Sequence, residues 1–419
     1  GDGWVATEWF FGKAENFERF AAAVAAAERE ACAQLCEGEP RSGRQGAARN
    51  GPAGAGAWYE GSPMHRVTSA IAAAIRDSVA AHMVADVPVG VFLSSGLDSC
   101  MLAAGAAATH PDVRAMTLGF REFEGTIDDE VPLAREVARS LGVAHDVYAV
   151  SRKDFVSQRL ALLDAMDQPS IDGVNTWFVA KAAAKSGLKV ALSGLGGDEI
   201  FASYPSFVDV PRMHKLARRF SGLPQIGRGF RTLTAPVAAR FASPKFASVL
   251  EYGNSFGGAY LLRRGLMMPW ELGQVLDPDF AREGVEKLQT ERELGALIDG
   301  IAPDRFRVSS LEMSMYMRNQ LLRDSDWASM AQSVELRVPF VDTTFLQTVA
   351  PWLAAFPELT KPEIAAACAP GLPAVTAGLS NLTTNSRTRA TSPCGETLVG
   401  LSAKAASPAA RAASTAKRA

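Results

Sequence analysis

The stretch that decides the fold is Val89 to Ser99, which reads VGVFLSSGLDS. Its first half is short, apolar and rich in β-branched residues, which is typical of a buried strand in a parallel sheet. Its second half is a Ser, Gly and Asp turn that opens into small residues typical of a helix. A strand that passes directly into a helix is the first half of a βαβ unit. We therefore expect this stretch to open an α/β fold.

The same alternation of strands and helices continues as far as residue 192. The expected strands are 89–93, 113–120, 145–150 and 188–192, and the expected helices are 99–108, 130–140, 155–166 and 176–186. This order predicts a doubly wound α/β fold, in which helices wrap a parallel sheet. Ligands bind such sheets where the carboxyl ends of strands meet the amino ends of helices. The loops after Leu93, Leu118 and Leu192 are therefore the candidate binding loops.

The rest of the chain has three different patterns. Residues 205–360 have helical periodicity and predict a helical cap on the sheet. A Gly, Arg, Pro and Ala-rich stretch at 37–61 predicts a linker or a disordered loop. After residue 374 the chain is rich in Ala, Ser, Thr and Arg, so we do not expect it to pack. The predicted division is an appendage and linker at 1–62, a main domain at 63–360 and a low-complexity tail at 361–419.

The composition excludes several classes of protein. With 419 residues, of which 47% are hydrophobic and 21% charged, the chain can bury a large core. A net charge of -2 provides no basic field for nucleic acid or an anionic membrane. No apolar run approaches the ~20 residues of a membrane span and no secretory signal is evident, so we expect a cytoplasmic protein. The five cysteines are scattered without CxxC pairs, which argues against a disulfide framework or a zinc site.

The loop from Ser94 to Ser99 has the composition of an anion site. A helix N-terminus offers unpaired N–H groups and a partial positive charge. Gly96 lets the backbone approach a phosphate, and Ser94 and Ser99 add hydroxyl donors. Asp98 would repel phosphate unless a cation lay between them, so we assign it to Mg²⁺. An ordinary Ser or Asp helix cap is the alternative, and the loop lacks the lysine of a Walker A motif.

A second Gly-rich loop, Ser193 to Glu199, follows the apolar strand that ends at Leu192. Its three glycines allow the backbone to reach a nucleotide, and two acids, Asp198 and Glu199, close it. We expect Asp198 to face Asp98, so that the two carboxylates hold one Mg²⁺ on a pyrophosphate. A Gly-rich turn followed by a capping Asp is the alternative. The two loops together predict a binding site more strongly than either loop alone.

Three segments resemble one family of enzymes. Residues 94–99 are similar to the SGGxDS pyrophosphate motif of the N-type ATP pyrophosphatases. Residues 193–205 resemble the SGxGxDExFxGYP stretch of asparagine synthetases. Residues 321–342 resemble the LLrd…SMa…EvRvPflD signature of the same enzymes. On these motifs, residues 64–360 resemble the C-terminal synthetase domain of glutamine-hydrolysing asparagine synthetases.

The resemblance implies a site for ATP and Mg²⁺. The ATP-binding positions that it implies are Leu93, Ser94, Ser95, Gly96, Leu97, Asp98, Ser99, Leu118, Ser193 and Gly194. It also implies that Asp98 and Asp198 are magnesium ligands and that the catalytic residues are Asp98, Asp198 and Glu199. The implied reaction is attack of a carboxylate, most simply that of aspartate, on the α-phosphorus of ATP. Pyrophosphate leaves, and ammonia then converts the acyl-adenylate to an amide and AMP.

Other positions that match the family are interpreted as structural. They are Glu130, Asp324, Glu335, Arg337 and Asp342, and charged residues in a helical cap are more often paired than catalytic. The polar loop 167–172 lies in the region expected near the substrate, although an ordinary turn explains it equally well. His145 has no evident nucleophile partner and is assigned no role.

Four features depart from the family pattern. Residue 1 is Gly1 and not the nucleophilic Cys of the family's glutaminase domain, so we expect residues 1–62 to be a remnant of that domain and nitrogen to come from ammonia or a glutaminase partner. Ser95 replaces a glycine, which would strain a backbone with positive φ and lower the affinity for ATP. Leu195 replaces a glutamate that faces the substrate, which leaves the carboxylate substrate open. Lys361 does not match the family's C-terminal KxxF-like lysine segment, and a shifted reading frame after Pro373 would account for its loss.

The leading interpretation is an ATP-dependent, amide-forming ligase of the asparagine synthetase type. Its ligands are ATP, Mg²⁺ and a small carboxylate, it has no nucleic-acid or membrane partner, and a homodimer is compatible with it. Two alternatives stay open: a β-lactam-forming or polysaccharide-modifying amidotransferase, and an inactive nucleotide-binding remnant. A tRNA thiolase on the same core is disfavoured, because the chain has neither a basic stripe nor a usable cysteine pair.

Overall fold

The structure is a computed structural model that describes residues 62–126, 128–170, 172–220, 227, 229–234, 244–372 and 375. The chain divides into two compact units. The sheet unit contains Ile75–Leu195, Gln320–Pro339 and the residues from Pro362 onward. The helical unit contains the residues up to Ala74, Gly196–Asn319 and Phe340–Lys361. The predicted N-terminal appendage and most of the predicted tail lie outside the described residues.

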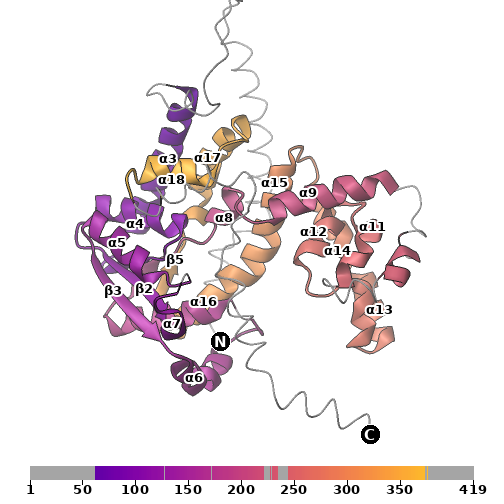
Figure 1. Ribbon diagram of the computed structural model, residues 1–419, viewed down its shortest axis with the longest axis horizontal. Helices are drawn as coiled ribbons and strands as arrows, with labels where there is room; N and C mark the ends of the chain where they lie inside the picture. The colour runs from indigo at the N-terminus through magenta and orange to yellow at the C-terminus, as the bar shows by residue number, and fades with distance from the viewer. Residues whose placement is uncertain are drawn as a thin grey trace, which may run out of the picture. The chain divides into compact units, whose positions relative to one another are not determined.

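The sheet unit is built on five parallel strands (Figure 1). They are β1 (Val89–Phe92), β2 (Arg114–Phe120), β3 (Ala144–Val150), β4 (Val190–Leu192) and β5 (Glu335–Arg337), in the order β3-β2-β1-β4-β5. The inner residues of β1 and all of β4 are buried, as expected for strands covered on both faces. The chain goes from β1 to β2 and β3 on one side and then to β4 on the other. This confirms the doubly wound α/β prediction and places the switch point between β1 and β4.

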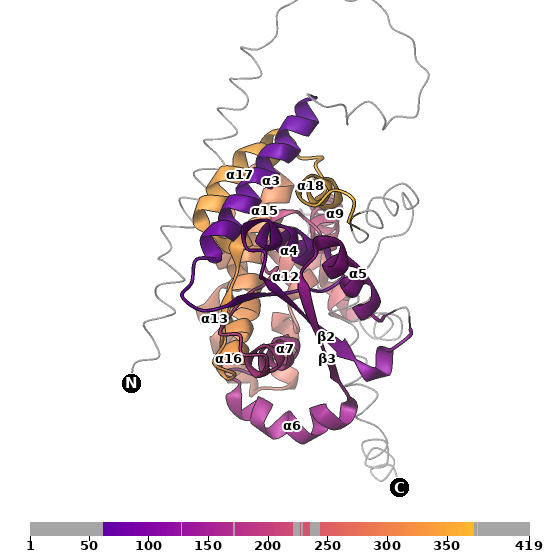
Figure 2. The same ribbon diagram turned by 90° about the vertical axis from the view of Figure 1, so that its left-hand side faces the viewer.

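Helices cover both faces of this sheet (Figure 2). On one face, α4 (Leu97–Thr109) and α5 (Val131–Leu141) pack against each other and against β1 to β3. On the other, α7 (Gly173–Lys185) contacts β2 and β3, while α16 (Leu322–Met330) contacts α7 and β5. Between β3 and α7, α6 (Arg152–Ala165) starts with a capping box of Ser151 and Asp154. The four helices predicted between residues 99 and 186 are all present.

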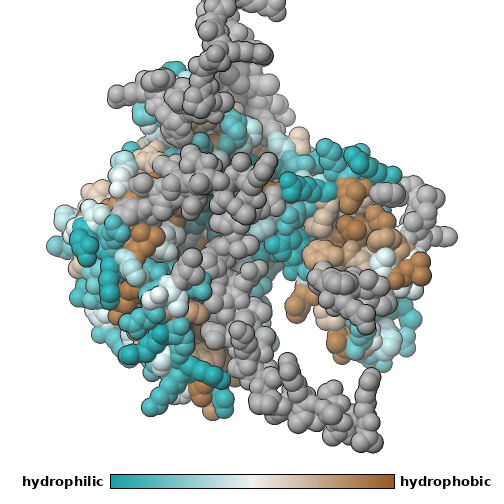
Figure 3. Space-filling model, viewed as in Figure 1, coloured by the Kyte–Doolittle hydropathy of each residue, from teal (hydrophilic) through white to brown (hydrophobic). Residues whose placement is uncertain are grey.

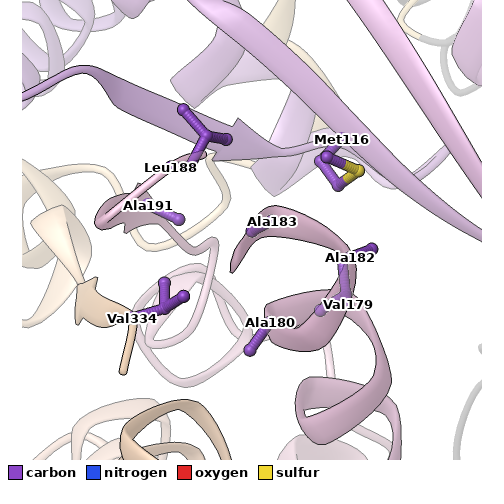
Figure 4. Packing of buried hydrophobic residues seen from close by; sticks show 8 residues of the cluster. All are labelled: Met116, Val179, Ala180, Ala182, Ala183, Leu188, Ala191 and Val334. Carbon is purple, nitrogen blue, oxygen red and sulfur yellow. The ribbon is translucent and has the colours of Figure 1, made fainter. Parts of the chain in front are cut away.

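Small side chains allow α7 to lie close to the sheet. Figure 4 shows Ala180 and Ala183 of α7 in one buried cluster with Met116 of β2 and Leu188 and Ala191 beside it. Methyl side chains keep the distance between helix and strand backbones short, so the cluster is densely packed. This packing fixes β4, whose carboxyl end leads into the second predicted loop.

The helical unit has its own core (Figure 1). Its helices are α8 (Gly197–Ile200), α9 (Ser206–Ala217), α11 (Val249–Tyr252), α12 (Phe256–Arg264), α13 (Pro278–Leu288), α14 (Thr290–Ala296), α15 (Asp304–Leu311) and α17 (Thr343–Ala355). Buried Val210, Phe256, Tyr260 and Leu311 join α9, α12 and α15. A π-helical segment, η5 (Glu312–Leu321), follows α15, and α3 (Pro63–His82) precedes the sheet. The prediction of a helix-rich second part is therefore confirmed.

The structure differs from the predicted cap at β5. Val190 to Leu192 pair in parallel with Glu335 to Arg337, so this part of the segment 205–360 belongs to the sheet. Its backbone bonds reach far back in the chain, for example from Glu335 N–H to Lys189 O at 2.8 Å. A three-residue strand has no periodicity that sequence analysis can detect, because its conformation depends on the neighbouring strand.

The start of the predicted tail is helical. α18 (Lys361–Cys368) buries Ile364 and Ala365, whereas the predicted low-complexity tail began at residue 361. Within the described ranges, none of the helices has the length and hydropathy to cross a bilayer.

Several large hydrophobic side chains of the helical unit are exposed. Figure 3 shows hydrophobic residues gathered over the helices that Figure 1 labels α11 to α14. Leu266, Val275, Phe280 and Leu288 are each more than half exposed. Scattered exposed hydrophobic residues are ordinary on protein surfaces, so we assign these no role in the site.

Candidate functional site

Two serine hydroxyls hold the loop after β1 in shape. Leu93 N–H donates to Met116 O (2.8 Å), which fixes the end of the strand. Ser94 N–H donates to Ser99 Oγ (3.1 Å), the two hydroxyl oxygens lie 3.0 Å apart, and Gly96 N–H donates to Ser94 Oγ (3.1 Å). The serines that were predicted to meet phosphate therefore also define the course of the loop.

The backbone of this loop accommodates a serine at position 95 without strain. Gly96, the residue before α4, has φ -74° and ψ 150°, which any residue adopts. The described non-glycine residues with positive φ are Ala202, Gln289 and Ser333, so Ser95 is not among them. The predicted backbone penalty at Ser95 is therefore wrong, because this position does not have the left-handed conformation that would require glycine.

The second loop packs directly against the first. Ser193 N–H donates to Arg337 O (2.8 Å), which ties the loop to the end of β5. A Cβ atom built on Gly194 would lie 2.8 Å from Asp98 Cβ and 3.3 Å from Ser99 N. Both distances are below ordinary van der Waals separation, so only a glycine fits here. The predicted binding positions of the two loops thus meet at the switch point of the sheet.

The remainder of the second loop belongs to the helical unit and leads into α8. Gly196 has φ 94°, and a Cβ there would lie 2.7 Å from Val341 Cγ2, so this position also requires glycine. Asp198 and Glu199 occupy the first turn of α8. Asp98 belongs to the sheet unit, and the expectation that Asp198 faces it stays a prediction.

Asp198 forms an ion pair with Lys361. Lys361 Nζ lies 2.5 Å from Asp198 Oδ1, and the lysine side chain is 11% exposed. Lys361 is the first residue of the predicted tail, for which no role in the site was expected. The two residues are 163 positions apart, so no local pattern could have paired them. A cation is therefore held at one of the predicted magnesium ligands, from a residue that sequence analysis missed.

Glu199 is an interior residue of the helical unit. Its side chain is 1% exposed, and Tyr204 Oη donates a hydrogen bond to its Oε1 (3.0 Å). Burial raises the pKa of Glu199 to about 8, because a carboxylate in the interior loses its hydration. The carboxyl can therefore hold a proton near neutral pH, whereas its predicted catalytic role stays a prediction.

A buried polar network supports this glutamate. Arg264 Nε donates to Glu312 Oε1 (3.0 Å), and the Glu312 side chain is fully buried. The guanidinium of Arg264 also lies over the rings of Tyr204 (4.6 Å) and Tyr316 (4.0 Å). Tyr204 thus contacts both the arginine and Glu199, which fixes the position of α8 within the helical unit.

The structural interpretation of Asp324, Arg337 and Asp342 agrees with their contacts. Asp342 caps α17 by accepting from Phe345 N–H (2.9 Å). Arg337 donates to the carbonyls of His82 (2.7 Å) and Val84 (2.8 Å). Asp324 is buried and accepts from Trp327 Nε1 (3.1 Å) and from the hydroxyl of Ser170, which anchors the loop 167–172.

The residues present are compatible with Mg²⁺ on a bound phosphate. Asp98 lies in the first turn of α4, beside the backbone of Gly194. Mg²⁺ needs only one or two carboxylates when phosphate oxygens and water complete its coordination. Among the described residues there is no cluster of three or more His, Cys, Asp or Glu side chains that would hold a metal without such a ligand.

A parallel sheet with two Gly and Ser-containing loops at its switch point defines a PP-loop α/β fold. Comparison with known families agrees: residues 70–352 match the model of the asparagine synthase family. The chain therefore belongs to the asparagine synthase family.

Individual relatives match the same region. A putative glutamine-hydrolysing asparagine synthetase of Mycobacterium tuberculosis (strain H37Rv) is 34% identical over 286 residues, which cover 65% of this chain and 40% of the relative. Asparagine synthetase 1 of Bacillus subtilis (strain 168) is 31% identical over 278 residues, 64% of this chain and 41% of the relative. Asparagine synthetase B of Escherichia coli (strain K12) is 29% identical over 161 residues, 34% of this chain and 28% of the relative. The match with the first two thus spans about two fifths of their length.

Proposed function

We propose that this chain binds ATP with Mg²⁺ at the switch point of its sheet and adenylates a carboxylate for conversion to an amide. The observation that carries the proposal is the contact between Gly194 and the first turn of α4, which carries Asp98. Two loops from β1 and β4 meet where a parallel sheet binds its ligands. Family membership supports the same chemistry, because the matched relatives are named asparagine synthetases.

In this proposal the phosphates of ATP bind at the amino end of α4. This helix has 13 residues and begins at Leu97 without a capping side chain, and a helix N-terminus of this kind suits an anion. Ser94 and Ser99 hold the loop in place by their mutual hydrogen bond. Leu97 and Ser95 then contribute backbone groups along the same turn, as the predicted set of ATP-binding positions requires.

The acidic residues would hold the cation that neutralises the negative charge of the phosphates. Asp98 is the proposed ligand of Mg²⁺, which when bound would neutralise phosphate charge as the reaction proceeds. Asp198 is proposed as the second ligand, and in the helical unit it is held by Lys361. The protein's own residues position these groups before the reaction begins, which lowers the activation barrier for adenylyl transfer.

The reaction breaks one bond of ATP and transfers the adenylyl group. A substrate carboxylate oxygen attacks the α-phosphorus, and pyrophosphate leaves. Ammonia then attacks the acyl carbon, loses a proton, and displaces AMP to give the amide. Aspartate is the proposed carboxylate, although Leu195 in the second loop leaves room for another substrate of the same class. Nitrogen is proposed to come from free ammonia or from a glutaminase partner.

The test is product release from the full chain. Purified protein is incubated with Mg²⁺-ATP, ammonium and aspartate, and AMP and pyrophosphate are measured. Asp98→Asn should abolish release, while Asp112→Ala, an exposed aspartate beyond α4, should leave it unchanged. Release only with a different carboxylate would correct the substrate. ATP binding without release, under all these conditions, would indicate an inactive nucleotide-binding remnant and refute the proposed activity.

A further inference from the structure

Thr117 on β2 is the centre of a short hydrogen-bond chain in the sheet unit. Its side chain is 2% exposed. Thr117 Oγ1 lies 2.6 Å from Leu93 O and 2.7 Å from His145 Nε2. A carbonyl oxygen only accepts, and a threonine hydroxyl has one proton to donate. Thr117 therefore donates to Leu93, and His145 must donate its Nε2 proton to Thr117.

These hydrogen bonds lie at the point where the β1–β2 pairing stops. In the described structure the paired residues run from Gly90–Arg114 to Phe92–Met116. Leu93 N–H still bonds to Met116 O, so the next ladder bond of a parallel pair would run from Leu118 N–H to Leu93 O. The hydroxyl of Thr117 takes that carbonyl instead. The strands thus stop pairing at the first predicted binding loop.

Leu118 is one of the positions at which the resemblance to the N-type ATP pyrophosphatases implies a contact with ATP. Alternate residues of a strand direct their backbone groups to opposite sides, so those of Leu118 point to the β1 side, as those of Met116 do. Beyond Met116 this side lies past the last residue pair. An adjacent N–H donor and C=O acceptor complement the edge of adenine, which offers a ring-nitrogen acceptor and an amino donor. On the same Watson–Crick edge, guanine offers the opposite arrangement, a ring N–H donor and a carbonyl acceptor.

We propose that His145 is a positioning residue of the nucleotide site, which directs the Thr117 hydroxyl to Leu93 and so leaves the Leu118 backbone to adenine. The inference rests on the proposed ATP site, to which the resemblance already assigns Leu118, and adds His145 to it. His145 acts through Thr117 and touches no reacting atom. It sits on β3, and its ring is half-buried. Burial and nearby Arg135 lower its pKa, which is consistent with a neutral ring whose Nε2 carries the proton.

The experiment compares ATP and GTP binding by the full chain, measured by calorimetry with Mg²⁺ present. His145→Leu removes the donor, His145→Gln replaces it with an amide N–H, and His110→Leu is the control, an exposed histidine at the far end of α4. We expect His145→Leu to weaken ATP binding about three- to tenfold, which is the worth of one hydrogen bond. GTP binding should change less, so the ATP preference falls. His145→Gln should retain most of the preference for ATP, because its amide N–H can replace the lost donor.

Each outcome decides between distinct conclusions. Unchanged ATP binding by His145→Leu would overturn the inference, as would equal losses for ATP and GTP accompanied by a lower Tm, which a purely structural role predicts. If His145→Leu does not fold, Thr117→Val, which keeps the shape of the side chain, serves instead and should also reduce the preference for ATP. A wild-type chain that binds neither nucleotide would refute the proposed function itself, and this inference with it.

Discussion

Replacing Gly194 by alanine tests the contact between the two loops. The added Cβ would lie 2.8 Å from Asp98 Cβ and 3.3 Å from Ser99 N. Carbon atoms in ordinary contact are about 3.5 Å apart or more, so the loops must separate by roughly 0.7 Å. Both neighbouring atoms belong to the first turn of α4 and cannot rotate away. The variant therefore has to displace the helix end that is proposed to hold phosphate.

The expected cost follows from this clash. Inserting one methyl group into a packed site costs about 1–3 kcal/mol. If a cost of about 2 kcal/mol, the middle of this range, is borne by the ATP-bound state, ATP binding would weaken about thirtyfold. A comparable loss of folding free energy would lower Tm by about 4–8 °C for a domain of this size. Calorimetry with Mg²⁺-ATP and thermal unfolding followed by circular dichroism measure the two effects.

The matched control is Gly142→Ala. Gly142 ends α5 with φ 69°, and a Cβ there would meet nothing within 4 Å. Alanine at this position costs about 1–2 kcal/mol through its backbone conformation alone. The control should lose stability but keep its affinity for ATP. If Gly194→Ala binds ATP as tightly as the wild type, the assignment of the phosphate site to this contact is wrong.

Three further predictions concern other parts of the molecule. Gly196→Ala should lower the free energy of unfolding by about 2–4 kcal/mol, since both its positive φ and the nearby Val341 oppose a side chain; urea unfolding would show this, and a loss below about 0.5 kcal/mol would contradict the backbone description. Arg264→Met should cost about 3–5 kcal/mol by leaving Glu312 buried and unpaired, and adding Glu312→Gln should recover part of this loss; no recovery in urea unfolding would mean that the ion pair is not the cause. Burial raises the pKa of the Cys368 thiol from 9.0 to about 12, so native protein holds it protonated at pH 9, where about half of the unfolded thiols are ionised. Alkylation of Cys368, which is partly buried, should therefore be at least about a hundredfold slower at pH 9 in native than in unfolded protein. Mass spectrometry measures the two rates, and equal rates would contradict the raised pKa.

Two adjacent acidic residues of the second loop, Asp198 and Glu199, have different neighbours in the helical unit. Lys361 neutralises Asp198, while Glu199 on the next position is buried and protonates readily. The two adjacent carboxyl groups therefore have different surroundings, because Asp198 has a cation beside it whereas Glu199 has lost its hydration, which raises its pKa. This difference could not be inferred from the letters DE in the sequence.

The fold was predictable because its signals are local. The runs at 89–93 and 188–192 are apolar and short, and the intervening segments have helical length, so the alternation itself indicates a parallel sheet. The loop that contains Gly194 was likewise predicted from its place after a strand, and the resemblance to asparagine synthetases implied Gly194 itself as a binding position. The contact that it makes with Asp98 follows from a rule that applies to all such sheets, namely that loops at the carboxyl ends meet at the switch point.

The sequence by itself thus determined the class of fold, and it predicted two candidate binding loops with residue types that suit phosphate and Mg²⁺, because hydrophobic periodicity and turn chemistry act over a few neighbouring residues. Only the tertiary structure decided that β5 joins the sheet, that Lys361 pairs with Asp198, and that His145 reaches Leu93 through Thr117. Each of these contacts joins residues that are distant in sequence, or depends on a ladder that stops at one particular pair. Their geometry arises only when the strands are assembled, and no pattern within a single segment encodes it.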